Sequence, residues 1–188
     1  MYYEDIEFTK DDVEALEFGG SEFFNCTFSG INFNNVDFSN LIFENCFFNS
    51  CHFTACNLSD TKFIEVVFKK CELISLTFSK INKFIIDLEF DSSFIKYCDF
   101  GNLDLSNTLF STSTLSECIF FETNLEKSNF TKCDLYGTTF ENCNLIKANF
   151  VGATRYRINP TTNKIKDAKF SIPEVIGLLE DFQIKIES

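Results

Sequence analysis

A strict five-residue repeat is the feature that most constrains how this chain folds. In a first run of thirteen, Phe or Leu occupies every fifth position: Phe18, Phe23, Phe28, Phe33, Phe38, Phe43, Phe48, Phe53, Leu58, Phe63, Phe68, Leu73 and Phe78. A second run of thirteen is shifted by two residues: Phe90, Ile95, Phe100, Leu105, Phe110, Leu115, Phe120, Leu125, Phe130, Leu135, Phe140, Leu145 and Phe150. A small or apolar residue stands two places before each of these positions, and the intervening residues are mostly polar.

Neither common periodicity explains this pattern. A strand exposes alternate residues, and a helix of 3.6 residues per turn drifts out of phase within two repeats. The chain is therefore expected to turn a corner every five residues, and four corners make a square coil of about twenty residues. Coils stacked at about 4.8 Å allow backbone amides to pair from coil to coil. Residues twenty apart then form ladders, with Phe90, Phe110, Phe130 and Phe150 facing Phe100, Phe120 and Phe140.

The sequence predicts an all-β protein in three parts. Residues 18–153 form the coiled column, residues 1–17 an acidic N-terminal cap, and residues 154–188 a C-terminal capping and dimerisation module with a short helix and strand. A register slip falls within 79–94, where Lys83 stands at a position due for burial. Ser171 and Pro173 are typical of a helix start, so a helix is expected over about 172–182.

Charge and composition exclude several functions. The net charge is −12, and residues 1–61 contain eleven acids and one base. A phosphate backbone is repelled by such a molecule, so we expect no direct contact with nucleic acid. The chain starts without a basic and apolar leader and has no run of about 18 apolar residues, which favours a cytoplasmic protein without membrane contact.

All nine cysteines stand two residues before a Phe or Leu of the repeat. Metal ligands converge on one point, whereas these side chains enter the column at spacings of five residues or more, so we interpret them as buried free thiols. Three pairs are twenty apart, at a distance that permits a disulfide, but the odd count favours thiols. His52, the only histidine, is expected to face outward with no nucleophile or orienting acid brought to it. No catalytic motif occurs, and a filled column leaves no cleft, so we expect neither an enzyme nor a cofactor.

The irregular positions are the candidates for function. The slip at 79–94 is interpreted either as a bulge or as a small protruding loop that carries Lys80, Lys83, Phe84, Asp87 and Glu89 to a partner. A second candidate contact surface consists of outward apolar residues that are expected to share one face: Phe24, Ile42 and Ile64.

The C-terminal segment is rich in apolar residues. Some of them, among the helix residues Val175, Ile176, Leu178, Leu179 and Phe182, are expected to cover the open last coil, where Phe150 otherwise meets water. The remainder either belong to the same cap or pair with a second copy across a two-fold axis. The residues assigned to this homodimer contact are Val175, Ile176, Leu179, Phe182, Ile184 and Ile186.

The repeat slots, with runs such as Ala148-Asn149-Phe150 and Cys133-Asp134-Leu135, resemble the pentapeptide-repeat family, whose members fold as right-handed quadrilateral β-helices. The tail, with Ile158-Asn159-Pro160 and Gly177-Leu178-Leu179, and the start, with Phe8-Thr9-Lys10, resemble its subgroup of Qnr quinolone-resistance and microcin B17 immunity proteins.

The resemblance implies a non-enzymatic homodimer, joined at its C-termini, that mimics DNA. Such a protein binds a type II topoisomerase, chiefly DNA gyrase, and protects it from quinolones or a gyrase-poisoning peptide toxin. This chain departs from the pattern, because Qnr proteins usually carry two projecting loops and only 79–94 serves here. The alternative function is a rigid interaction scaffold with a partner that is not a topoisomerase.

Overall fold

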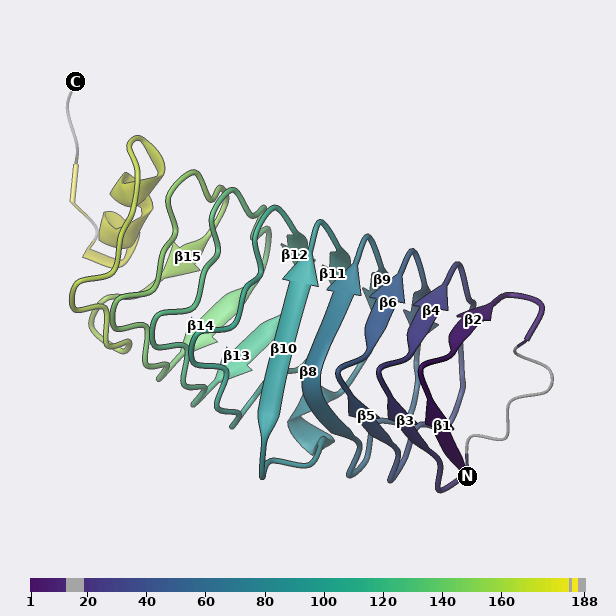
Figure 1. The fold of residues 1–188 in the computed structure, drawn as a ribbon. Coiled ribbons are helices and arrows are strands. Elements are labelled where there is room, and N and C mark those ends of the chain that lie inside the picture. The colour runs from purple at the N-terminus through teal and green to yellow at the C-terminus, as the bar shows by residue number, and fades with distance from the viewer. Residues whose placement is uncertain (13–18, 183, 186–188) are drawn as a thin grey trace.

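The structure is a computed structural model that describes residues 1–12, 19–182 and 184–185. The chain winds into a column of stacked coils with its two ends at opposite ends of the column (Figure 1). Short parallel strands build the walls, because residues twenty apart pair through their backbones, as Tyr3 does with Phe23 and Phe23 with Phe43. The predicted quadrilateral β-helix is confirmed. No helix among the described residues is long and apolar enough to cross a membrane.

We name the four walls A to D in the order in which the chain follows them. Walls A and B form one sheet, since β8 (Lys62–Lys69) and β10 (Ile86–Asp91) run around the corner between them. Wall A also holds β1 (Tyr2–Glu4), β3 (Glu22–Phe24) and β5 (Ile42–Glu44). Wall B also holds β2 (Glu7–Thr9), β4 (Thr27–Ser29) and β6 (Phe47–Asn49).

Wall C consists of β7 (His52–Thr54), β9 (Glu72–Ile74), β11 (Phe94–Lys96) and β12 (Thr114–Ser116). Wall D contains β13 (Ile119–Phe121), β14 (Thr139–Glu141), β15 (Arg157–Ile158) and the short 3-10 helix η2 (Phe78–Lys80). A second 3-10 helix, η3 (Glu174–Phe182), follows the last coil and lies at the C-terminal end of the column (Figure 1).

The corners are formed by residues in the left-handed region of backbone conformation. From Asn35 to Ser75 every fifth residue has a φ between 52° and 62°: Asn35, Asn40, Asn45, Ser50, Ala55, Asp60, Glu65, Lys70 and Ser75. This conformation costs a residue other than glycine about 1–2 kcal/mol. Burial of one Phe or Leu side chain stabilises the fold by about 1.5–3 kcal/mol, so the side chain that each five-residue step buries offsets its corner.

Stacked rings fill the column. On wall B one ladder runs from Phe8 through Phe28, Phe48, Phe68, Phe90, Phe110, Phe130 and Phe150 to Phe170, with successive ring centroids 4.7–5.5 Å apart. Wall D carries the opposing ladder, and the two meet edge to face, as Phe90 and Phe100 do at 6.0 Å and 84°. The two predicted Phe ladders are confirmed. The eight steps of the wall B ladder correspond to a rod of about 38 Å.

The position two residues before each buried Phe, Leu or Ile of the repeat supplies hydrogen-bond donors as well as volume. All nine cysteines occupy it and are buried and free, which confirms the prediction of buried thiols. Their Sγ atoms also reach backbone carbonyls of the previous coil, for example from Cys46 to Phe23 at 3.3 Å. Thr61 makes the same contact through Oγ1, to the carbonyl oxygen of Phe38 at 2.8 Å.

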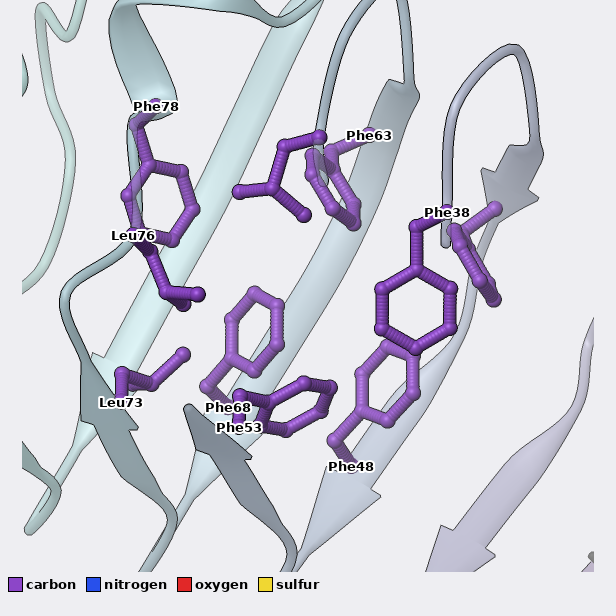
Figure 2. A pocket seen from close by; sticks show the side chains of 10 residues that line it. Phe38, Phe48, Phe53, Phe63, Phe68, Leu73, Leu76 and Phe78 are labelled. Carbon is purple, nitrogen blue, oxygen red and sulfur yellow. The ribbon is translucent and has the colours of Figure 1, made fainter. Parts of the chain in front are cut away.

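The column is less completely filled around one residue. In the wall D ladder Leu58 stands between Phe38 and Phe78, where the rest of that ladder is mostly Phe. A cavity of about 10 Å³ remains there; its ten lining residues are Phe38, Phe43, Phe48, Phe53, Leu58, Phe63, Phe68, Leu73, Leu76 and Phe78 (Figure 2). This volume is near the minimum for a single water molecule, and its lining is entirely apolar, so the cavity is a packing defect rather than a ligand site.

The N-terminal segment differs from the expected cap. β1 and β2 pair in register with β3 and β4, and Tyr3 stacks on Phe23 at 5.0 Å, so residues 2–9 already belong to the coil. The physical reason lies in the sequence, because Tyr3 and Phe8 continue the five-residue phase backwards. After β2, Asp12 accepts hydrogen bonds from the backbone N–H and hydroxyl of Thr9. Phe18, the first residue of the predicted repeat, lies outside the described residues.

The coil also continues beyond Ala153. Phe170 stacks on Phe150 at 5.2 Å, although residues 154–170 lack the regular repeat. Ser171 Oγ accepts a hydrogen bond from the Gly152 N–H instead of capping the helix, which begins at Glu174. The expected strand is not present at the exposed Ile184 or at Lys185, and Ile186 lies outside the described residues.

Candidate interaction surfaces

The register slip lies within residues 83–87. The carbonyl oxygen of Lys80 accepts the N–H of Asp60, and the N–H of Asn82 donates to Thr61, both in the twenty-residue register of the first coils. Leu88 pairs with Val66, which is already the shifted register. Two extra residues are therefore inserted between Asn82 and Leu88.

This insertion both shifts the register and protrudes. The Phe84 side chain is 90% exposed and Ile85 is also exposed, whereas Ile86 packs partly against the core. At the loop tip the Phe84 N–H donates to Asn82 Oδ1 at 3.1 Å, a contact within the loop itself. A Phe ring held in water with so little cover is a candidate for burial against a partner.

The residues predicted to accompany Phe84 do not all gather on this loop. Lys83 and Asp87 are exposed on it. Lys80 ends η2 at the corner between walls D and A. Glu89 lies around the next corner on wall B, where it pairs with Val67 and bridges to Leu109.

Phe24, Ile42 and Ile64 do share wall A, on β3, β5 and β8. The register sets Ile42 between Glu22 and Lys62, and Glu44 between Phe24 and Ile64. Apolar and charged side chains therefore alternate both along each strand and from coil to coil, over three coils. The three apolar side chains are half-buried. We call this surface the wall A patch; its residues are Tyr2, Glu22, Phe24, Ile42, Glu44, Lys62 and Ile64.

Tyr2 belongs to the wall A patch and was missed in the sequence. Its ring lies 5.0 Å from that of Phe24, centroid to centroid. The signal was present, since Tyr2 is twenty residues before Glu22, but residues 1–17 were assigned to a separate cap.

The structure also brings the two predicted partner surfaces together. Ile86, directly after the exposed loop tip, pairs with Phe63 of β8, the neighbour of Ile64. The Phe84 loop therefore occupies the next coil of wall A. Glu4, Asp5, Glu22 and Glu44 give the N-terminal part of this wall a negative charge, and within the described residues neither Glu22 nor Glu44 forms a salt bridge.

The helix η3 presents one apolar edge to solvent. A 3-10 helix has three residues per turn, so Ile176, Leu179 and Phe182 line up along it. Their exposed fractions are 45%, 40% and 49%, whereas Leu178 packs against the core and Val175 is half-buried. Arg157 anchors the helix through Asp181, at 3.1 Å between Nη2 and Oδ1.

His52 has an acidic neighbour, contrary to the expectation from the sequence. Its Nδ1 lies 3.3 Å from Glu72 Oε2 on the next coil of wall C, because the two residues are twenty apart. Both side chains are exposed, so the pair is a surface contact. No group of three or more His, Cys, Asp or Glu residues suited to a metal ion occurs among the described residues.

These features define a class of protein: a parallel four-sided β-helix whose five-residue steps each bury one Phe, Leu or Ile side chain. The family model for pentapeptide repeats matches eight copies, over residues 17–54, 31–69, 98–135 and 123–154. The chain belongs to the pentapeptide-repeat family.

Solved structures align with most of the chain, and the one with a TM-score of 0.50 has the same fold. A trypsin-treated form of QnrB1, described as a plasmid-mediated fluoroquinolone resistance protein, aligns with 100% of this chain and 97% of its own, at 14% identity and a TM-score of 0.50. HetL from the cyanobacterium Nostoc sp., described as involved in heterocyst differentiation regulation, aligns with 90% of this chain and 82% of its own, at 13% identity and a TM-score of 0.41. No curated protein compared with the chain matches it.

Proposed function

We propose that this protein is a non-enzymatic mimic of duplex DNA that binds a type II topoisomerase, with DNA gyrase as the expected partner. Binding protects the enzyme from quinolones or from a gyrase-poisoning peptide. The observation that carries the proposal is the wall A patch, in which carboxylates alternate with half-exposed apolar side chains on a rigid rod, next to the exposed Phe84. The fold shared with QnrB1 makes a resistance function the first one to test.

Two kinds of contact act in this proposal. Glu22 and Glu44 meet basic residues that otherwise hold DNA phosphates, which steers the encounter and makes it sensitive to salt. Phe24, Ile42 and Ile64, together with the Phe84 ring, lose contact with water on binding, and their burial supplies affinity that salt does not screen. The rigid column requires no folding of these coils on binding, so little conformational entropy is lost.

We further propose that two copies join through the edge of η3 formed by Ile176, Leu179 and Phe182. A two-fold axis brings this edge against itself, so that each apolar residue faces the same set in the partner. Val175 is assigned to support of the helix, and Ile184 lies beyond it as an exposed extension of the edge. Such a dimer places the acidic ends of the two rods outward.

The proposed dimer is tested by light scattering on the eluting protein. The wild-type chain is expected at twice its mass of 21.7 kDa, and Leu179→Asp at the mass of a monomer. Thr161→Asp, at an exposed position on the same end of the rod, serves as the control and is expected to remain a dimer. A monomeric wild type at micromolar concentration contradicts the proposed dimer.

The proposed activity is tested with purified DNA gyrase, relaxed plasmid and a quinolone at low salt. We expect micromolar protein to alter supercoiling or to reduce the DNA cleavage that the quinolone stabilises. An unchanged supercoiling rate together with unchanged drug sensitivity counts against the proposal. Capture of a different protein, with gyrase unaffected, supports the rigid scaffold instead.

A further inference from the structure

The charges of the rod are separated along its axis. Residues 1–61 contain eleven acids and one base, whereas residues 127–169 contain eight bases and three acids. The net charge of −12 therefore includes a basic segment of +5, which lies between the rest of the column and the acidic residues 170–188, with four acids and one base. Four coils separate Phe48 from Phe130 on wall B, about 19 Å at the spacing of paired strands. Exposed charges are screened over about 8 Å at physiological salt, so the acidic end and the basic segment each act on a ligand almost independently of the other.

Five lysines of the basic segment gather around the corner of the column where walls A and B meet, two of them in the corner itself and three on the last coil beside it. We call them the lysine edge: Lys127, Lys147, Lys164, Lys166 and Lys169. Lys127 and Lys147 occupy the same corner of successive coils, each with a left-handed φ near 60°. Lys164 and Lys169 continue the wall A and wall B columns by bridging to Asn144 and Asn149, and the Lys166 carbonyl accepts the Lys147 N–H at 2.9 Å.

The lysine edge is exposed and largely unpaired. All five lysines are exposed, and Lys127 approaches Glu126 at 3.4 Å. Lys147, Lys164, Lys166 and Lys169 form no salt bridge with any described residue. Asp167 is the other acid on this edge, in the corner above Lys147, so the edge with both acids retains a net charge of +3.

Amide groups add neutral donors beside these lysines. Asn129, Asn149 and Lys169 form one column on wall B. The Oδ1 atoms of Asn129 and Asn149 accept the N–H groups of Thr131 and Val151, so their Nδ2 groups can still donate. The helix η3 does not cover this edge, because it is anchored by Arg157 on wall D.

We propose that the lysine edge binds the phosphate backbone of duplex DNA. A cluster of cations that extends over three successive coils of a rigid rod fits a rigid polyanion, and lysine and amide donors are typical of phosphate contacts. No element that reads base edges lies there, so the binding is independent of sequence. This inference reverses the expectation from net charge, because screening lets the basic segment act locally. Beside a topoisomerase, the acidic end contacts the enzyme while the lysine edge holds its DNA.

The test measures fluorescence anisotropy of a labelled duplex of about 20 base pairs without any topoisomerase, so its outcome is independent of the proposed function. We expect binding at about 50 mM salt that weakens as salt rises. The triple variant Lys147→Gln, Lys166→Gln and Lys169→Gln is expected to bind at least about tenfold more weakly, with the slope of log K against log salt reduced by about 3.

Two controls make the outcome decisive. The same three lysines changed to Arg keep the charge and are expected to retain binding. Lys69→Gln, Lys70→Gln and Lys96→Gln remove the same charge from coils outside the lysine edge and the wall A patch, and are expected to leave binding unchanged. No binding by the wild type, or equal weakening by the two Gln triples, overturns the proposal. A loss of self-association in the lysine-edge triple, with DNA binding intact, also overturns it and identifies the edge as a contact with a second copy.

Discussion

The Oγ1 atom of Thr138 donates a 2.8 Å hydrogen bond to the carbonyl oxygen of Leu115, 23 residues earlier. It also accepts the N–H of Cys118 at 3.3 Å, so one small side chain serves two backbone groups inside the column. The Oγ1 atom of Thr123 likewise donates a hydrogen bond to the carbonyl oxygen of Phe100, at 2.9 Å. The residue two places before each buried Phe, Leu or Ile of the repeat therefore needs to be small enough for the corner and is often a donor.

Thr138→Val tests this role at nearly constant volume. Loss of the hydroxyl leaves a buried carbonyl and a buried N–H without their partner, so the free energy of unfolding is expected to fall by about 1–3 kcal/mol. Urea unfolding measures the change. Thr138→Ser is expected to keep most of the stability, and Thr139→Val, on the exposed face, to change it by less than about 0.5 kcal/mol. A loss below that value for Thr138→Val contradicts the role.

The buried thiols predict a loss of stability in alkali. Burial raises the pKa of Cys46 to about 12, that of Cys56 to about 11 and that of Cys133 to about 12. Above about pH 9 the unfolded chain has released thiol protons that the folded chain still holds. Each such thiol therefore lowers the free energy of unfolding by about 1.4 kcal/mol per pH unit until the folded pKa is reached.

Urea titrations under reducing conditions between about pH 8 and pH 10.5 measure this slope. Cys56→Ala is expected to make the decline shallower by about 1.4 kcal/mol per pH unit above about pH 9. An identical slope in the variant and the wild type rules out the assigned pKa of Cys56.

The period of the sequence was sufficient to predict the column, because a five-residue repeat admits few other ways of burying one ring per step. The same rule placed Phe24, Ile42 and Ile64 on one wall. The prediction from the period was wrong at the N-terminus. Tyr3 and Phe8 follow the five-residue phase, but their acidic neighbours led to the prediction of a separate cap. The prediction from the period was also wrong after Ala153, where contact with the preceding coil, rather than a repeat, imposes the geometry on residues 154–170.

The position of the Phe84 loop could not be predicted for a different reason. Ile86 and Leu88 fit the old phase and Phe90 fits the new one, so the sequence tolerates the insertion at several places. The backbone pairing of Asn82 and Leu88 decides between them. The His52 and Glu72 pair was available from the sequence, since twenty residues separate them, and was overlooked.

The cavity beside Leu58 predicts an unusual tolerance of a larger side chain. Leu58→Phe completes the wall D ladder between Phe38 and Phe78 and fills existing space, so the stability is expected to change by less than about 1 kcal/mol. Leu125→Phe enlarges a residue in a filled part of the column and is expected to cost about 1–3 kcal/mol. Thermal and urea unfolding compare the two variants. Equal losses contradict the account of the packing.

Removal of the Tyr156 hydroxyl is predicted to stabilise the protein. Tyr156 is 7% exposed, and its hydroxyl has no hydrogen-bond partner among the described residues. Burial raises its pKa to about 12. Tyr156→Phe is expected to raise the free energy of unfolding by about 0.5–1 kcal/mol, because a buried polar atom without a partner is removed. Tyr136→Phe, at an exposed position, is the control; a loss above about 1 kcal/mol in Tyr156→Phe identifies a hydrogen bond to that hydroxyl.

The contact surface proposed on wall A is tested most directly by the affinity of the protein for immobilised DNA gyrase. Glu22→Lys combined with Glu44→Lys reverses two charges of the wall A patch and is expected to weaken binding at low salt by at least about tenfold. Glu122→Lys combined with Glu141→Lys makes the same change of charge at the corner between walls D and A and on wall D, and is expected to remain within about twofold of the wild type. Equal affinities of the wall A variant and the wild type contradict the account.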